Sequence, residues 1–224
     1  MIKKIKSYLL YNANQNNEDS ISNKLRKKRL EFFLKFCDHL KKPVTILDLG
    51  GSDYHWRNSN FRNNKDYHIM IVNNEVPDIK NFRNICFIKK DVRDLEFFDD
   101  KEYDLVYSNS LLEHLNKFEE QKNLAEEIKR IGKHHFIQTP NYYFPLEPHF
   151  LFPFFQFLSD KAKTNLLLKY NLGWYGRQDE QSKALELSSS IRLLKKSELK
   201  DIFPGSQIYT EKYFFLNKSF TVYS

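Results

Sequence analysis

The sequence predicts an α/β fold, a three-layer sandwich in which helices cover a seven-stranded, mostly parallel sheet whose last strand is antiparallel. Three observations lead to this prediction. Short apolar runs alternate with amphipathic stretches over residues 21–140. Most of these runs end at Gly, Asn or Asp, which favour turns. Two further runs close the chain without a helical stretch between them, as expected for an antiparallel pair.

Five apolar runs of about six residues are rich in β-branched and aromatic side chains, which is typical of strands buried on both faces. A helix is predicted from Ile21, with Asp19 or Ser20 as its N-cap and Pro43 beyond its end. Another helix is predicted over 111–132. The five predicted strands cover residues 44–49, 67–72, 85–90, 103–108 and 134–139.

Residues 141–190 interrupt this alternation. We predict a loop first, then a helix over 152–173 and an irregular stretch over 174–190. The regular pattern resumes in the last thirty or so residues, where turn residues bound each element. That part is expected to form a helix over 195–203 and paired strands over 207–215 and 218–224.

The expected domain organisation follows from these elements. Residues 1–43 form a basic, helical N-terminal segment, and residues 44–224 form one domain. A chain of 224 residues is long enough for one such core but short for two. Because the segment 141–190 follows the fifth strand, we expect it to be an insert over the active site.

The positive charge of the chain lies in its N-terminal segment. Residues 1–43 hold 11 Lys and Arg against 4 Asp and Glu, and residues 44–224 hold 25 of each sign. Such a run is either a solvated helix face or a weak contact with an anionic surface. Nucleic acid is a less favoured partner, because the neutral remainder offers no basic groove beside the predicted site.

Two further features suggest the compartment. The N-terminus turns polar after Tyr11, unlike a signal peptide, and no apolar stretch reaches the ~20 residues of a membrane span. We therefore expect a cytoplasmic protein. Cys37 and Cys86 form neither a disulfide framework nor a metal-binding pair, and both are predicted to be reduced and buried.

Polar residues and glycines follow four of the predicted parallel strands. The carboxyl ends of such strands meet at one edge of the sheet, where ligands bind. Glycines after the first strand let the backbone turn and approach a ligand. The dinucleotide pattern GxGxxG is absent, which argues against NAD. The set predicts a nucleoside-containing cofactor held by Asp48, Gly50, Gly51, Asn73, Glu75, Asp91, Val92, Ser108 and Asn109.

These motifs resemble those of class I methyltransferases. ILDLGGSD (46–53) is similar to their glycine motif, and KKDVRDL (89–95) with YDLVYSNSLLEHL (103–115) resembles the methyltransferase type 11 and type 23 domains. FIQTPNYYFPLEPHFLFPFFQFL (136–158) is similar to a signature of a bacterial subset. The resemblance covers about residues 44–224. It implies a Rossmann-like fold and S-adenosylmethionine (SAM) as the cofactor.

The resemblance also implies a role for each strand end. Asp48 and Gly50 would lie beside the methionine part of SAM, and Asn73 and Glu75 would bind the ribose hydroxyls. Asp91, with the backbone of Val92, would meet the adenine. Ser108 and Asn109 would line the floor near the sulfonium. Asn73 stands where the family usually has an acidic residue, and Ser52 where it often has a third small one.

Methyl transfer requires alignment of the acceptor with the methyl group and often removal of a proton. His149 and His114 are the candidate catalytic residues, and Glu147 lies in the same stretch as His149. Each histidine could instead have a structural role. Glu113 with the two histidines could supply three metal ligands, but Ser110 stands where a second acid would be expected, so no metal is predicted.

The predicted function is transfer of a methyl group from SAM to an acceptor, an oxygen of a small molecule or sugar. The identity of the acceptor class rests on the resemblance alone. The alternative is a non-catalytic SAM-binding partner subunit in a complex, which the shortened glycine motif favours. An RNA methyltransferase is disfavoured by the neutral charge of residues 44–224.

Overall fold

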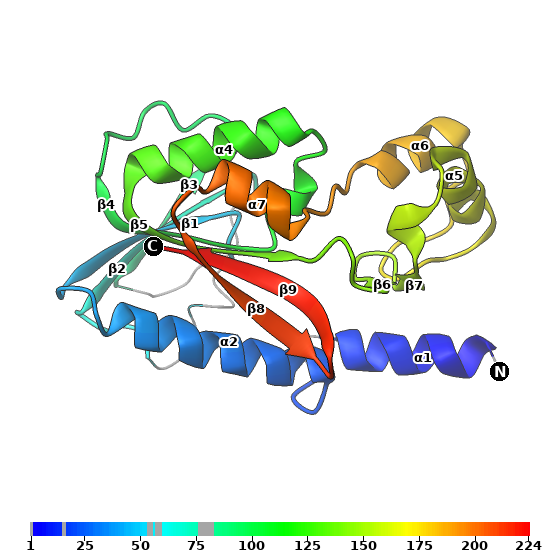
Figure 1. The fold of residues 1–224 in the computed structure, drawn as a ribbon, viewed down its shortest axis with the longest axis horizontal. Coiled ribbons are helices and arrows are strands. Elements are labelled where there is room, and N and C mark those ends of the chain that lie inside the picture. Colours follow the sequence, from blue (N-terminus) through cyan, green and yellow to red (C-terminus); the bar gives the residue numbers. More distant parts are fainter. Residues whose placement is uncertain (1, 15–16, 53–55, 57–59, 76–82) are drawn as a thin grey trace. The chain divides into compact units, whose positions relative to one another are not determined.

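The computed structural model describes residues 2–14, 17–52, 56, 60–75 and 83–224, and these fall into two compact units (Figure 1). The sheet unit comprises Leu40–Tyr143 and Ile191–Ser224. The helical unit comprises Met1–His39 and Phe144–Ser190. The second of these segments nearly coincides with the insert predicted over 141–190.

The sheet unit is built around seven strands in the order β3-β2-β1-β4-β5-β9-β8. Neighbours among β1 to β5 run parallel, and β9 is antiparallel to both β5 and β8. The predicted three-layer α/β fold, with a seven-stranded sheet and a reversed last strand, is confirmed. The strands are β1 (Val44–Leu49), β2 (Tyr67–Asn73), β3 (Ile85–Lys89), β4 (Tyr103–Asn109), β5 (Gly132–Pro140), β8 (Gln207–Tyr213) and β9 (Leu216–Tyr223).

Two α-helices cover one face of this sheet, α4 (Phe118–Ile131) and α7 (Lys196–Ile202) (Figure 1). Leu124, Ala125, Ile128 and Ile131 recur at helical spacing on α4 and are all buried against the strands. The single helix predicted over 111–132 is wrong. A 3₁₀ turn, η1 (Leu112–His114), comes first, and extended backbone at Leu115 separates it from α4.

Aromatic rings pack on the opposite face of the sheet. Trp56 contacts Phe61 and Tyr107 edge to face, with ring centroids 4.9 and 5.3 Å apart. Tyr107 stacks on Phe136 of the next strand at 6.0 Å. Phe, Trp and Tyr make up 16% of the chain, and part of this aromatic content is thus core. Asp48 pairs in register with Tyr107, so its carboxylate points into this aromatic layer.

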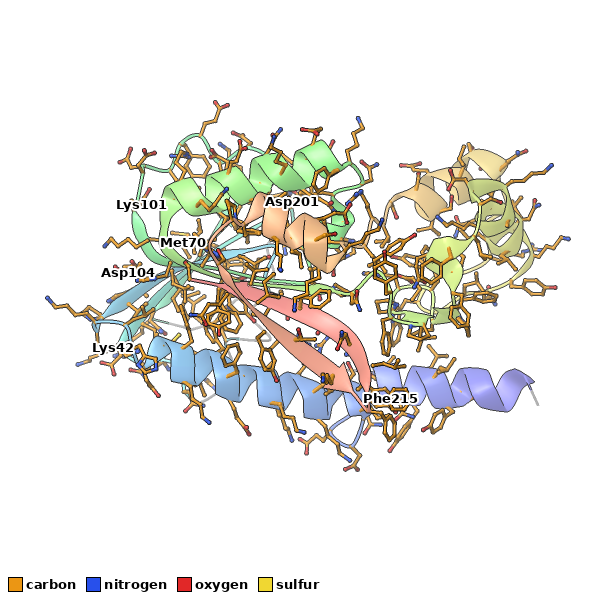
Figure 2. All side chains as sticks on the ribbon, in the orientation of Figure 1. Lys42, Met70, Lys101, Asp104, Asp201 and Phe215 are labelled. Atoms are coloured by element: carbon orange, nitrogen blue, oxygen red, sulfur yellow. The ribbon has the colours of Figure 1, made fainter. Side chains whose placement is uncertain are left out.

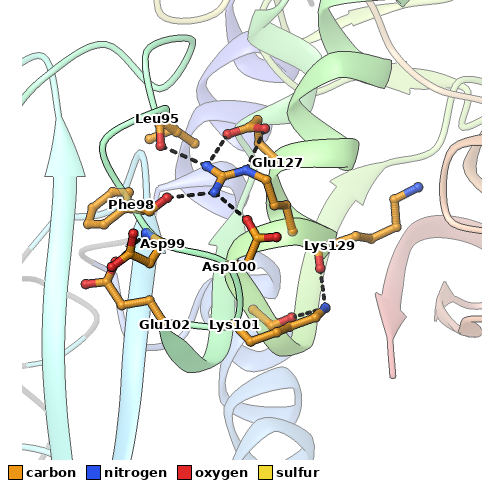
Figure 3. A network of polar contacts seen from close by, with 10 residues as sticks. Leu95, Phe98, Asp99, Asp100, Lys101, Glu102, Glu127 and Lys129 are labelled. Atoms are coloured by element: carbon orange, nitrogen blue, oxygen red, sulfur yellow. Dashed lines mark hydrogen bonds and ion pairs between the residues drawn. The ribbon is translucent and has the colours of Figure 1, made fainter.

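The last turn of α4 is tied to the loop that precedes β4 (Figure 3). The Arg130 guanidinium donates to the backbone oxygens of Leu95 and Phe98 and pairs with Asp100 and Glu127. The Lys101 ammonium donates to two carbonyls at the end of the helix, where cations are favoured. These bonds fix the start of β4 and hence the position of its far end.

The helical unit contains α1 and α2 from the N-terminus and a second group of elements from residues 144–190. Ser20 caps α2 as predicted, accepting from the Asn23 N–H. The helix predicted over 152–173 is replaced by three elements, because Ser159 caps a new helix. The stretch 174–190 was predicted to be irregular, which is wrong, since it contains α6. The elements are α1 (Ile2–Ala13), α2 (Ile21–Cys37), β6 (Leu146–Glu147), β7 (Phe152–Pro153), η2 (Phe155–Phe157), α5 (Asp160–Lys169) and α6 (Gln181–Ser189).

The two cysteines differ in environment. Cys37 is buried, as predicted, and Cys86 is exposed, which corrects the prediction. The reason is that β3 is an edge strand, so an apolar run there is not covered on both faces. No helix among the described residues is long and apolar enough to cross a membrane.

Candidate functional site

The carboxyl ends of β1 to β4 lie at one edge of the sheet. The register places Leu49 beside Val72 on one side and beside Ser108 on the other, and it pairs Asn73 with Lys89. The residues that follow these positions therefore emerge together. The residues predicted to bind the cofactor follow these four strands, and the topology brings the four strand ends to the same edge.

Asp48 is a buried carboxylate with one oxygen satisfied. The Trp56 indole N–H donates to its Oδ2 at 2.6 Å. Its Oδ1 has no hydrogen-bond partner among the described residues. Burial raises the pKa of Asp48 to about 7, although the Trp56 bond opposes this rise. A buried, half-satisfied carboxyl at this edge is suited to accept a hydrogen bond from a cationic or N–H-bearing ligand.

The two glycines after β1 are required first by the protein itself. Gly50 has a φ of +73° and donates its N–H to Val72, and a Cβ there would lie 2.7 Å from Leu111 Cδ1. A Cβ on Gly51 would lie 1.7 Å from Asp48 Oδ2. The sequence predicts that these glycines let the backbone come close to a ligand. The space beside Gly51 is instead filled by the Asp48 carboxylate.

Asn73 holds the glycine loop through its side-chain amide. Its Nδ2 donates to the backbone oxygens of Gly51 at 2.8 Å and Gly50 at 3.3 Å. Its Oδ1 accepts from the Glu75 N–H at 3.2 Å. A carboxylate could not donate these bonds, so the amide of Asn73 has a structural role at this position. Glu75 itself is exposed, so its carboxylate is the acidic group at this strand end.

The remaining strand ends are also engaged by the protein. Both carboxylate oxygens of Asp91 bind Arg93, and this pairing lowers the Asp91 pKa. Val92 is buried in the core. The buried Ser108 hydroxyl donates to the Leu49 carbonyl at 3.0 Å, which links β4 to β1. Asn109 is the last residue of β4.

Glu113 and His114 lie in η1 with opposite exposure. Glu113 is fully buried and accepts from the Thr139 hydroxyl at 2.9 Å, while its carbonyl accepts from the Arg192 N–H. His114 is exposed. These two residues belong to the sheet unit and His149 belongs to the helical unit.

His149 is held by a carboxylate two residues before it. Its Nδ1 lies 2.7 Å from Glu147 Oε1. The other carboxylate oxygen accepts from the backbone N–H groups of His149 at 2.8 Å and Phe150 at 2.7 Å. The Glu147 side chain is only 2% exposed, and that of His149 is 15% exposed. Glu147 therefore fixes both the ring and the turn that carries it.

The sequence marks Glu147 as a candidate beside the two histidines, but it does not indicate that Glu147 holds the turn that carries His149. The signal was present in the spacing, because a carboxylate can bond backbone N–H groups two and three residues ahead in a turn. In the sequence Glu-Pro-His, the imidazole of His149 then binds the same carboxylate. Phe150 then stacks on Phe155, with ring centroids 4.1 Å apart, and anchors the turn in the helical unit.

Residues 64–135 match a protein family described as a methyltransferase domain. This stretch contains β2 to β4 and their strand ends. This part of the chain is similar to a class I methyltransferase domain. The resemblance drawn from the motifs is thereby confirmed, and SAM is the cofactor of this domain class.

The chain is also similar to other proteins in sequence and in structure. Two uncharacterized proteins from Mycobacterium tuberculosis strains are 33% identical over 60 residues, which span 27% of this chain and 20% of each relative. The N-methyltransferase NodS from Bradyrhizobium japonicum has a TM-score of 0.51 and 8% identity, covering 92% of this chain and 97% of NodS. A possible exported protein from Bordetella parapertussis also reaches 0.51, with 11% identity and coverage of 88% and 66%. These structural likenesses support the fold.

We predict that Asp48 makes stability depend on pH. The pKa of Asp48 is about 7 in the folded protein and has an ordinary value of 3.8 in an unfolded chain, so between these pH values only the folded protein keeps the proton. The free energy of unfolding should therefore fall as the pH rises through this window and level off above it. Asp48→Asn should remove this contribution, as measured by urea denaturation at several pH values.

Wild type must be compared with Asp48→Asn because His135 changes the free energy of unfolding with pH in the opposite direction. Burial lowers its pKa from 6.5 to about 4, so its contribution rises with pH over that interval. The difference between wild type and Asp48→Asn isolates the carboxyl. Parallel curves for the two proteins would show that folding does not raise the pKa of Asp48.

We predict a modest effect for Asp91→Ala on SAM affinity. Loss of one hydrogen bond to a neutral adenine edge should weaken binding by about tenfold or less. The matched control is Arg93→Gln, which removes the partner and leaves the carboxylate in place. Calorimetry with S-adenosylhomocysteine measures both. Unchanged affinity in Asp91→Ala would place the adenine elsewhere.

Proposed function

We propose that this protein transfers a methyl group from SAM to an oxygen of a small molecule or sugar, with His149 as the base that removes the hydroxyl proton. The observation that carries the proposal is the imidazole of His149 on the buried carboxylate of Glu147, at 2.7 Å. A neutral hydroxyl is a weak nucleophile, and a positioned base is the feature such an acceptor requires.

The bond to Glu147 determines which nitrogen acts. A carboxylate accepts a hydrogen bond, so Nδ1 carries the proton and Nε2 carries the lone pair. The negative charge also stabilises the imidazolium that forms when the base takes its proton. Glu147 is therefore a positioning residue. The proposal requires the helical unit to present His149 to the acceptor.

The glycine loop and Asp48 are proposed to hold the cofactor. The unpartnered Oδ1 of Asp48 fits the amino group of the methionine part, because a buried carboxyl oxygen needs an N–H donor. Asn73 keeps the loop closed, and Glu75 supplies an exposed carboxylate for a ribose hydroxyl. When bound, SAM supplies the methyl group on a sulfonium that is a good leaving group.

Several finer assignments belong to the same proposal. Ser108 and Asn109 would line the floor near the sulfonium, and Asp91 with Val92 would border the adenine. His114, exposed on η1, is the second candidate for the base. Aromatic residues of the segment 141–160 would line the acceptor pocket and shield the methyl group from water. The acceptor is a small molecule or glycan, and the proposed location is the cytoplasm.

The test is binding followed by turnover. SAM and S-adenosylhomocysteine should bind with a dissociation constant of about 1 µM, or roughly −8 kcal/mol. Radiolabelled SAM and a panel of phenols, sugars and amines should then show transfer to hydroxyls. Binding of NAD in place of both ligands would overturn the proposal. Binding without transfer to any acceptor would favour the non-catalytic SAM-binding subunit.

A further inference from the structure

The β8–β9 hairpin ends in two exposed phenylalanines. Phe214 and Phe215 are 79% and 85% exposed, more than any other large apolar side chain among the described residues. Figure 2 labels Phe215 at the turn between the two strands. Leu216 beside them is 38% exposed, and Tyr209 further back is 40% exposed. The hairpin therefore ends in an apolar tip, which we define as residues 213–216.

The turn itself is chemically unusual. Tyr213 pairs with Leu216, so the connection consists of Phe214 and Phe215 alone. Two-residue hairpin turns favour Gly, Asn and Asp, because at least one residue has a positive φ. Phe214 has a φ of +52°, in the region that bulky side chains rarely adopt. Neither backbone preference nor contact with water favours phenylalanine here.

The structure nevertheless holds the tip in place. Behind it, the buried carboxylate of Glu211 accepts from the Ser219 hydroxyl at 2.9 Å and pairs with the Lys218 ammonium at 3.5 Å. The Tyr213 ring meets the Phe214 ring edge to face, with centroids 4.7 Å apart. The tip is thus presented on paired strands rather than on a flexible loop.

The charges around the tip are positive. Glu211 is the one acidic residue between positions 202 and 224, and it is buried against Lys218. Lys212 is exposed beside the turn. The order along the hairpin is phenylalanine at the end, then tyrosine and lysine. Such an order suits the surface of a bilayer, where rings enter the acyl boundary and cations remain among the headgroups.

We propose that the apolar tip binds the surface of an anionic lipid bilayer, with Phe214 and Phe215 inserted. Charge favours this occupant over a second copy of the chain. The formal net charge is +7, which comes from residues 1–43, so two copies of the chain repel each other and an anionic surface attracts the chain. At the tip itself, the exposed Lys212 supplies the local positive charge. The proposal is independent of the methyl acceptor and of the base.

The test is sedimentation of the full chain with vesicles of phosphatidylcholine and phosphatidylglycerol in equal parts, and with vesicles of phosphatidylcholine alone. The variant Phe214→Gly/Phe215→Asn removes both rings and places glycine at the positive φ, so the hairpin should keep or gain stability. Phe97→Ser is the matched control, because it removes a half-exposed ring elsewhere in the sheet unit.

Wild type and Phe97→Ser should bind the anionic vesicles, less so at high salt, and the tip variant should bind about tenfold or more weakly. Thermal melting and light scattering accompany each sample. The proposal is overturned if the wild-type protein does not bind the anionic vesicles. It is also overturned if the tip variant binds them as strongly as wild type. A wild-type dimer that the tip variant converts to monomer would also overturn it and assign the tip to self-association.

Discussion

Replacing His149 by alanine is expected to lower kcat by about 10²–10⁴-fold while SAM affinity is unchanged. The reason is that the proposed role of the imidazole is to remove a proton from the acceptor, and it makes no bond to the cofactor. The ring packs on Glu147 within a turn that Glu147 also holds through two backbone N–H groups. The turn should therefore survive loss of the ring.

Glu147→Gln is the companion to this variant. A glutamine keeps one acceptor oxygen, which can serve the two backbone N–H groups that Glu147 Oε2 binds. Its NH2 group cannot accept from the imidazole, and it lacks the charge that stabilises the imidazolium. We expect an intermediate loss of kcat and a pH profile whose acidic limb is shifted toward lower pH, because the imidazole loses a charge that favours its protonated form. A structural role for His149 gives the opposite pattern, in which thermal stability and acceptor KM suffer and kcat at saturation is nearly kept. That result would exclude His149 and make His114 the next candidate.

The sheet could be predicted because each strand is encoded locally. Runs such as VTILDL and YDLVYS are continuous and apolar, as parallel strands buried on both faces require, and each ends at a turn residue. Their parallel direction follows from the alternation of strands and helices. The helical unit was less predictable, because the elements of residues 144–190 are short. Their ends are set by caps and turns, and none is long enough to show a clear helical periodicity of apolar residues. Helix α6 shows this, since few of its residues are buried.

The strand ends were predicted as a set, but their individual bonds could not be. Sequence indicates that Asp48 follows an apolar strand. It does not indicate that the indole of Trp56 covers it, because that contact depends on how the chain returns over the sheet. The amide of Asn73 is a similar case. The side chain of Asn73 donates to the carbonyls of Gly50 and Gly51. These bonds depend on the conformation of the loop, which the sequence does not give.

Gly51→Ala is expected to destabilise the sheet unit by about 3 kcal/mol or more and to abolish SAM binding. The new methyl group would lie 1.7 Å from Asp48 Oδ2, far inside contact distance. The carboxylate must therefore move and lose its bond to Trp56. Urea denaturation measures the first effect and calorimetry the second. Gly50→Ala is the control, with an expected loss of about 1–2 kcal/mol from its positive φ.

A double-mutant cycle decides whether the Asp48 carboxylate is the cause. Asp48→Ala alone should destabilise the protein, because it leaves the Trp56 N–H without its acceptor in a buried layer. On that background the side chain that opposes a Cβ at position 51 is gone. Gly51→Ala should then cost less than about 1 kcal/mol, so the two substitutions are strongly non-additive. An equal loss in both backgrounds would show that the backbone, rather than the carboxylate, requires glycine at this position.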